Sequence, residues 1–265
     1  MSNSNVILCD SHMHVFSHHE VIQSSNYVAP AKDLSDFILE ATTEDIGRAV
    51  VVQASIDGTN NSRLLETLLH HDQLTLRGVA MIDEHSKDLE ILANAGVRAL
   101  RIQDRTRLGI NDLERLPQLA AMGAEVDWHV EINTEPARYE RLKQLLNELP
   151  AGQAVVLDHF GHCAPLNLEQ RHQLCRLLDT GRVWIKLAPT RVSQHVGNYK
   201  DLTAIVQTLA AGYTERCLWG SDWPHVMTAD PLPKTTDMLA FYKNVLTTEQ
   251  FAACFSHNPA KLYKF

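Results

Sequence analysis

The sequence predicts an α/β fold, a TIM-type (β/α)₈ barrel that forms a single domain over residues 1–265. Eight short apolar segments alternate with longer amphipathic ones along the 265 residues, as expected when a helix follows each strand. Barrels of this type often contain roughly 250 residues in one domain. No linker, low-complexity tract or block of like charges divides the chain. A doubly wound open sheet is the alternative, but the sequence has no glycine-rich phosphate loop after its first strand.

The predicted strands are short runs rich in Val, Ile and Leu. Several are almost continuously apolar, which is typical of strands buried on both faces of a parallel sheet. In chain order they span residues 6–16, 48–55, 74–83, 97–103, 126–133, 154–161, 183–189 and 217–225.

Amphipathic helices are expected between these strands. Asn111 and Glu114 have the spacing of a capping box, and Gly123 is placed to end the same helix. Pro136 stands near the first turn of the next helix, where proline is tolerated. The clearest helical segments lie within residues 59–72, 111–123, 134–150, 167–181 and 247–265.

Composition and charge narrow the class of protein. Hydrophobic residues make up 45% and charged residues 21%, an ordinary soluble composition that can bury a large core. The net charge of −8 argues against nucleic acid as a partner, and no apolar run approaches the roughly 18 residues that span a membrane. The five Cys form no C-x-x-C pair, and the chain start lacks a basic segment followed by a long apolar run. We therefore expect a reduced, cytoplasmic protein, a monomer or a homodimer.

Polar side chains collect at the carboxyl ends of the predicted strands, where barrel enzymes place their functional groups. His12 and His14 alternate with Met13, so both imidazoles point to the same side of the first strand. Two imidazoles roughly 7 Å apart can converge on one ion or on one substrate group. His159 after the sixth strand and Asp222 after the eighth complete a candidate catalytic cluster. A carboxylate that points into a barrel is costly to bury unless it is paired or catalytic.

A second group of candidates would bind the substrate. Arg101, Arg107 and Arg191 follow the fourth and seventh strands, and guanidinium groups bind carboxylates in bidentate fashion. His129 on the fifth strand and His225 after Pro224 are further candidates. We expect two neighbouring arginines to lie outside this set, Arg98 and Arg105.

These residues resemble the amidohydrolase superfamily, and more narrowly its 2-pyrone-4,6-dicarboxylate lactonase-like branch. The resemblance runs over essentially the whole chain and is carried, in order, by "DSHMHVF", "GVRALRIQ", "WHVEI", "VVLDHFGH", "VWIKLAPTRVS", "WGSDWPH" and "HNPAKLY". It implies a distorted (β/α)₈ barrel that hydrolyses a small anionic lactone similar to 2-pyrone-4,6-dicarboxylate. In such an enzyme Asp222 would activate water and the histidines His12, His14 and His159 would polarise the lactone carbonyl. Substrate carboxylates would be bound by Arg101, Arg107 and Arg191.

The resemblance also bears on metal content. This branch works without a bound metal, and Arg101 stands where the superfamily has a bridging lysine at the end of the fourth strand. We therefore expect no cofactor. The alternative is a single Zn²⁺ held by His12, His14, His159 and Asp222, as in a zinc-dependent amidohydrolase or decarboxylase.

Two further alternatives remain open. One is a sugar-acid lactonase or a lactone isomerase, because the branch also holds these enzymes and sulfomuconolactone hydrolases. The other is a barrel that binds an acidic metabolite without converting it. Glu131 and His162 depart from the usual pattern, and an extra carboxylate at Glu131 would weaken the binding of a dianion.

Overall fold

The structure is a computed structural model that describes residues 6–17, 22–23, 27–70, 73–106 and 109–265. Its central feature is the expected barrel of eight parallel strands in the order β1-β4-β5-β6-β8-β9-β10-β11, which confirms the predicted fold class. The strands are β1 (Leu8–Met13), β4 (Ile46–Val52), β5 (Thr75–Ala80), β6 (Val97–Arg105), β8 (His129–Asn133), β9 (Val155–Leu157), β10 (Val183–Leu187) and β11 (Cys217–Trp219).

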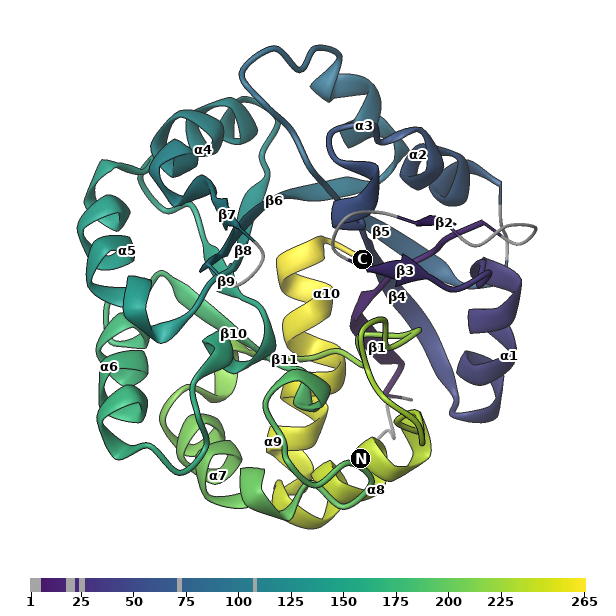
Figure 1. The fold of residues 1–265 in the computed structure, drawn as a ribbon, viewed down its shortest axis with the longest axis vertical. Coiled ribbons are helices and arrows are strands. Elements are labelled where there is room, and N and C mark those ends of the chain that lie inside the picture. The colour runs from purple at the N-terminus through teal and green to yellow at the C-terminus, as the bar shows by residue number, and fades with distance from the viewer. Residues whose placement is uncertain (1–5, 18–21, 24–26, 71–72, 107–108) are drawn as a thin grey trace, which may run out of the picture.

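Helices surround the strands, as Figure 1 shows. The outer ring consists of α1 (Leu34–Thr43), α2 (Ser62–Leu69), α3 (Leu89–Ala95), α4 (Leu116–Glu125), α5 (Tyr139–Leu145), α6 (Leu168–Leu178), α7 (Thr203–Gly212) and α8 (Thr235–Val245). The chain ends in α9 (Thr248–Ala252), a π-helical turn (Ala253–His257) and α10 (Asn258–Tyr263). No helix in the described parts of the chain is both long and apolar enough to cross a membrane.

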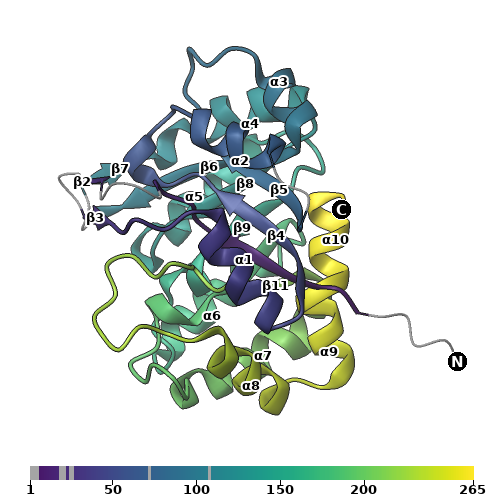
Figure 2. The ribbon, with the colours of Figure 1, turned by 90° about the vertical axis from the view of Figure 1, so that its right-hand side faces the viewer.

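The two ends of the barrel differ. Helix α10 lies at the end where the strands begin, and the short strands β2 (Ile22–Gln23), β3 (Val28–Ala29) and β7 (Ile110–Asn111) lie at the end where they finish (Figure 2). Tyr263 of α10 is fully buried and packs with small apolar side chains of the inner barrel face, Cys9, Val50, Val79 and Leu218. The C-terminal helix therefore closes one end of the barrel, and the other end stays available for a site.

Two local predictions are wrong. Gly123 does not end the predicted helix, because it lies inside α4, which continues to Glu125. Asn111 makes no side-chain capping hydrogen bond, and the turn that it precedes is a 3₁₀-helix over Asp112–Arg115. The reason is that Asn111 pairs with Asp104 in the β6–β7 ladder, so its backbone belongs to a strand. Capping boxes occur instead at Asp33 before α1 and at Thr247 before α9.

The barrel is closed by backbone contacts between β1 and the segment after β11. Met13 and Trp223 form an isolated parallel bridge, and the backbone N–H of His14 donates to the Trp223 carbonyl at 2.8 Å. The backbone N–H of Asp222 donates to the His12 carbonyl, also at 2.8 Å. Closure therefore places Asp222 beside the two histidines of the first strand.

The carboxylate of Asp10 and the missing side chain of Gly220 make this closure possible. Asp10 Oδ1 accepts hydrogen bonds from the backbone N–H groups of His12 at 3.0 Å and of Ser221 at 2.9 Å. A Cβ atom on Gly220 would lie 2.5 Å from Cβ and 2.9 Å from the backbone nitrogen of His12. The two segments can approach this closely only because residue 220 is glycine.

We predict that Gly220→Ala destabilises the protein by about 1–3 kcal/mol, because the added methyl group overpacks the closure at His12. Gly212→Ala is the matched control. A Cβ atom there meets no other atom within 4 Å, and the change should be neutral or stabilise α7 by less than about 1 kcal/mol. Urea unfolding followed by circular dichroism measures both, and equal stabilities would contradict this account of the closure.

Candidate active site

A cavity opens at the carboxyl ends of the strands, and most of the predicted site residues meet there. Predicted residues in its lining are His14, Arg101, His159, Arg191 and Asp222. The remaining lining residues are Tyr27, Ala54, Ser55, Gln103, Arg105, Asn133, His162, Val226 and Met227.

The two histidines of the first strand converge on one carboxylate oxygen. Nε2 of His12 lies 3.7 Å and Nε2 of His14 3.5 Å from Asp222 Oδ1, and the two rings meet edge to face with centroids 5.0 Å apart. Nδ1 of His14 lies 2.7 Å from the carbonyl oxygen of Val52. A carbonyl only accepts hydrogen bonds, so Nδ1 of His14 carries a proton.

Asp222 is buried yet ionised. Burial alone would raise its pKa, but the Arg191 guanidinium and the surrounding histidines hold it well below its usual range. Nε of Arg191 donates to Asp222 Oδ2 at 2.5 Å, and the hydroxyl of Thr190 lies 3.4 Å from the same oxygen. The other oxygen, Oδ1, faces the histidines. Asp222 is therefore a carboxylate with one side held by a cation and the other directed at the imidazoles.

His159 completes the cluster from β9. Its ring centroid lies 4.8 Å from that of His12 and 5.3 Å from that of His162. It adopts a left-handed backbone conformation with φ 49°, which is rare for a residue with a side chain and is frequent at functional sites. Burial lowers the pKa of His159 well below its usual value and that of His12 to about 4, so both rings are neutral near pH 7.

The predicted arginines are bound by protein groups. Nε and Nη2 of Arg101 donate to Asp158 Oδ2 at 3.3 and 3.1 Å, and its Nη1 donates to the Gln53 carbonyl at 3.2 Å. Arg191 holds Asp222 and also donates to the Val226 carbonyl at 2.5 Å. Arg107 lies outside the described residues. Arg101 and Arg191 therefore pair with carboxylates of the protein, at Asp158 and Asp222, in addition to any substrate carboxylate that they bind.

Several residues are placed differently from the prediction. His12 is fully buried behind the cavity and is not among the residues that line it. His129 is the first residue of β8, and it lines a different hollow together with Trp128 and Lys264 at the opposite end of the barrel. Its expected position at the carboxyl end of a strand, beside the substrate, is wrong because β8 continues to Asn133. Arg105, which we expected to lie outside the set, lines the cavity because β6 extends to it.

His225 is buried, but it is absent from the cavity lining. Burial lowers its pKa to about 4. Its backbone N–H donates to the Asp222 carbonyl at 2.9 Å, which places it in the turn that follows the catalytic candidate.

The sequence did not reveal a row of hydrogen-bonded polar side chains, Gln103, Asn133 and His162, in the cavity lining. The amide of Asn133 donates to Gln103 Oε1 at 2.8 Å, and Nε2 of His162 lies 2.8 Å from Asn133 Oδ1. The alternation of side chains along a strand could have identified Gln103 and Asn133. Gln103 lies two residues after Arg101 and therefore on the same face of its strand, and Asn133 lies two residues after Glu131 in the same way.

A fully buried ionic network lies beneath the histidines. Nζ of Lys186 contacts Glu131 Oε2 at 2.5 Å, His12 Nδ1 at 3.1 Å and Asp158 Oδ1 at 3.5 Å. The hydroxyl of Tyr263 donates to Glu131 Oε1 at 2.5 Å. Burial alone would raise the pKa of Glu131, but the Lys186 ammonium holds it below its usual range. Glu131 does not line the cavity, so its negative charge is no obstacle to a dianionic ligand.

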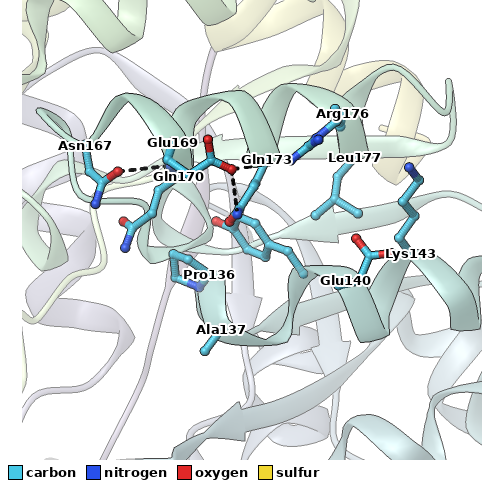
Figure 3. A pocket seen from close by; sticks show the side chains of 11 residues that line it. Pro136, Ala137, Glu140, Lys143, Asn167, Glu169, Gln170, Gln173, Arg176 and Leu177 are labelled. Atoms are coloured by element: carbon cyan, nitrogen blue, oxygen red, sulfur yellow. Dashed lines mark hydrogen bonds and ion pairs between the residues drawn. The ribbon is translucent and has the colours of Figure 1, made fainter.

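A separate hollow of about 500 Å³ lies on the outer surface between α5 and α6 (Figure 3). Its polar groups pair along α6 itself: Glu169 Oε1 contacts Gln173 Nε2 at 2.9 Å and Arg176 Nη2 at 3.5 Å. It is distant from the histidine cluster, and nothing in its lining converges on a ligand.

Comparisons with known proteins agree with this geometry. A family model described as Amidohydrolase matches residues 9–265. The chain is 29% identical over 245 residues to a 4-sulfomuconolactone hydrolase of Rhizobium radiobacter, covering 87% of this chain and 80% of that protein. It is 27% identical over 274 residues to a 2-pyrone-4,6-dicarboxylate hydrolase of Comamonas testosteroni, covering 96% of this chain and 89% of that protein.

A solved structure shares the fold over nearly its whole length. It is described as a probable 2-pyrone-4,6-dicarboxylic acid hydrolase of Acinetobacter baumannii with citric acid bound. The TM-score is 0.83 and the sequences are 26% identical, with 97% of this chain and 99% of the other covered.

We predict that Asp158→Asn destabilises the protein by about 3–5 kcal/mol, because it leaves the buried guanidinium of Arg101 without its counter-charge and removes one of the two carboxylates beside Lys186. Asp127→Asn is the control, since Asp127 is 88% exposed and pairs with Lys264 at the surface. It should change the stability by less than about 0.5 kcal/mol. Urea denaturation compares the two variants, and a small effect of Asp158→Asn would show that its charge is not needed to hold the cations.

Proposed function

The chain belongs to the amidohydrolase family, and we propose that it is a lactone hydrolase that opens a small carboxylated lactone. The observation that carries the proposal is the Asp222 carboxylate, which is kept ionised inside the barrel and lies 3.5 and 3.7 Å from two imidazoles. The relatives named as 4-sulfomuconolactone and 2-pyrone-4,6-dicarboxylate hydrolases support the choice of substrate class.

In the proposed reaction Asp222 is the general base. Its free oxygen Oδ1 takes a proton from a water molecule, and the resulting hydroxide attacks the lactone carbonyl. The tetrahedral intermediate carries a negative charge on the former carbonyl oxygen. It collapses by breaking the ring C–O bond, and protonated Asp222 returns its proton to the leaving oxygen, which yields the hydroxy acid. Neutral imidazoles stabilise the charged oxygen of the intermediate by donating N–H hydrogen bonds in a site that excludes most water, where such bonds are strongest. We assign this role to His12 and His159. His14 uses its Nδ1 proton for the Val52 carbonyl and faces Asp222 with its other ring nitrogen, so we assign it to the placement of the attacking water.

Substrate carboxylates would be bound at the arginine side of the cavity. A guanidinium has five N–H donors, and the contacts to protein groups use three in Arg101 and two in Arg191. Those that remain can bind a carboxylate of the ligand, and Arg107 keeps its predicted role. Because Arg191 holds both the general base and the ligand, it would couple substrate binding to the position of Asp222.

A hydroxylated sugar-acid lactone is the second candidate substrate. The observation in its favour is the hydrogen-bonded row of Gln103, Asn133 and His162, which offers hydrogen-bonding partners to hydroxyl groups. Isomerisation between two lactones would use the same groups.

We further propose that the reaction needs no metal ion. His12, His14 and Asp222 each offer one ligand atom, and these atoms lie within 4.8 Å of one another, so a zinc ligand set is present in outline. Two of the three are already in contact with a positive charge. Lys186 lies 3.1 Å from His12, and Arg191 lies 2.5 Å from Asp222. A divalent cation would add to these two charges, so this donor set fits it poorly.

We predict that the protein hydrolyses lactones with one or two carboxylates and keeps its activity after treatment with a chelator. The measurement is hydrolysis of a lactone panel, with and without chelator, on protein whose metal content has been determined. Faster turnover of hydroxylated sugar-acid lactones would favour the second candidate. Stoichiometric zinc together with loss of turnover on chelation would contradict the metal-free mechanism.

We predict that Asp222→Asn lowers kcat at least about 100-fold, because the amide cannot accept the proton of the attacking water. Substrate binding, measured by calorimetric titration of the variant, should persist because the arginines remain in place. Asp127→Asn at the surface serves as the control and should leave kcat unchanged. Normal turnover by Asp222→Asn would remove Asp222 from the role of general base.

A further inference from the structure

The buried lysine Lys186 touches no part of the cavity lining, yet it contacts a histidine of the candidate catalytic cluster. Its Nζ lies 3.1 Å from Nδ1 of His12, and both side chains are fully buried. An ammonium group has three donors and no acceptor. The hydrogen bond therefore runs from Lys186 to His12, and Nδ1 of His12 must offer a lone pair.

A competing partner lies close to the same ring atom. Asp158 Oδ1 is 3.2 Å from His12 Nδ1 and would draw a proton to Nδ1 if it accepted a hydrogen bond there. Within the described residues, however, Asp158 Oδ1 makes no hydrogen bond, whereas Lys186 lies within hydrogen-bond distance of the same ring atom. The geometry thus favours donation by Lys186.

Lys186 is held as a cation by its other neighbours. Glu131 lies 2.5 Å away, Asp158 lies 3.5 Å away, and all three side chains are fully buried. Glu131 in turn accepts a hydrogen bond from Tyr263 of the C-terminal helix. A buried ammonium without such partners would be strongly unfavourable, so the two carboxylates keep Lys186 charged and in place.

We propose that Lys186 is a positioning residue that acts through His12: it occupies Nδ1 and so keeps the single ring proton on Nε2. Nε2 lies 3.7 Å from Asp222 Oδ1 and has no hydrogen-bond partner among the described residues. It is thus an unused donor beside the general base. The catalytic consequence rests on the proposed lactone hydrolysis, in which this donor stabilises the oxyanion.

The same reasoning separates the two histidines of the H-x-H motif. The Val52 carbonyl accepts a hydrogen bond from Nδ1 of His14, so this atom carries a proton. In His12 the same ring atom faces the Lys186 ammonium, which can only donate. The two imidazoles of the motif are therefore held at Nδ1 by opposite kinds of partner.

The direct test is the tautomer of His12, observed by two-bond ¹⁵N–¹H correlation spectra of protein labelled at histidine. Loss of one signal in His12→Gln assigns the ring. The wild-type protein should show the proton on Nε2. In Lys186→Met the proton should move to Nδ1, where Asp158 can accept it. A wild-type proton on Nδ1, as metal binding at Nε2 would also produce, overturns the proposal, and so does an unchanged tautomer in Lys186→Met.

Kinetics provide the second readout. Lys186→Met should lower kcat by about 100- to 1,000-fold with little change in KM, the effect of losing one oxyanion donor. Lys186→Arg, which can only donate, should keep the proton on Nε2 and restore part of kcat. Lys143→Met on the outer helix α5 is the control and should match the wild type. If Lys186→Met does not fold, the proposal is tested by the His12 tautomer in the wild-type protein and in Lys186→Arg. A proton on Nδ1 of His12 in either protein overturns it.

The spectra need no substrate, so the two proposals fail separately. A tautomer that switches in a protein without lactonase activity would overturn the proposed function and leave the role of Lys186 toward His12 intact. Lactone hydrolysis with an unchanged tautomer would overturn only the role of Lys186.

Discussion

The closure of the barrel between β1 and the segment after β11 is the contact on which the site depends. Two backbone hydrogen bonds of 2.8 Å join these segments, and the Asp10 carboxylate accepts from the backbone of both. Asp10 is fully buried, and this burial raises its pKa to about 7. Because Gly220 has no side chain, Asp222 comes within 4 Å of His12 and His14. The bond network that closes the fold also assembles the general base and its imidazoles.

Charge compensation explains the arrangement around that closure. Each buried carboxylate of the site has a basic partner: Asp222 has Arg191, Asp158 has Arg101 and Glu131 has Lys186. Buried ion pairs add little net stability, because desolvation offsets most of the attraction. Their value here is chemical. They keep Asp222 ionised as a base and hold Lys186 beside His12, while burial lowers the pKa values of His12 and His159.

Much of the fold and part of the site could be predicted from the sequence. The alternation of apolar and amphipathic segments indicated eight strands with helices between them, because burial on both faces demands near-continuous apolar runs. The alternation of side chains along a strand placed His12 and His14 on one side, and the position after the last strand singled out Asp222. Strand boundaries were less certain. His129 was misplaced because β8 begins at this residue and not at residue 126, and Arg105 was misplaced because β6 continues past residue 103. The capping box predicted at Asn111 was wrong because Asn111 pairs with β6, and this pairing outweighs the local preference of asparagine for a helix N-terminus.

The sequence by itself thus determined which residue types stand at the ends of the strands, and with them the barrel, the acidic and imidazole groups and the arginines. Only the tertiary structure decided their partners. Arg191 and Arg101 were expected to bind carboxylates of the substrate. In the structure Arg191 binds Asp222 and Arg101 binds Asp158. Lys186, Glu131 and Tyr263 lie far apart along the chain and meet beneath His12. Pairing of buried charges is a non-local requirement: each must find a counter-charge within a few ångströms, and strand order and register determine which one it meets.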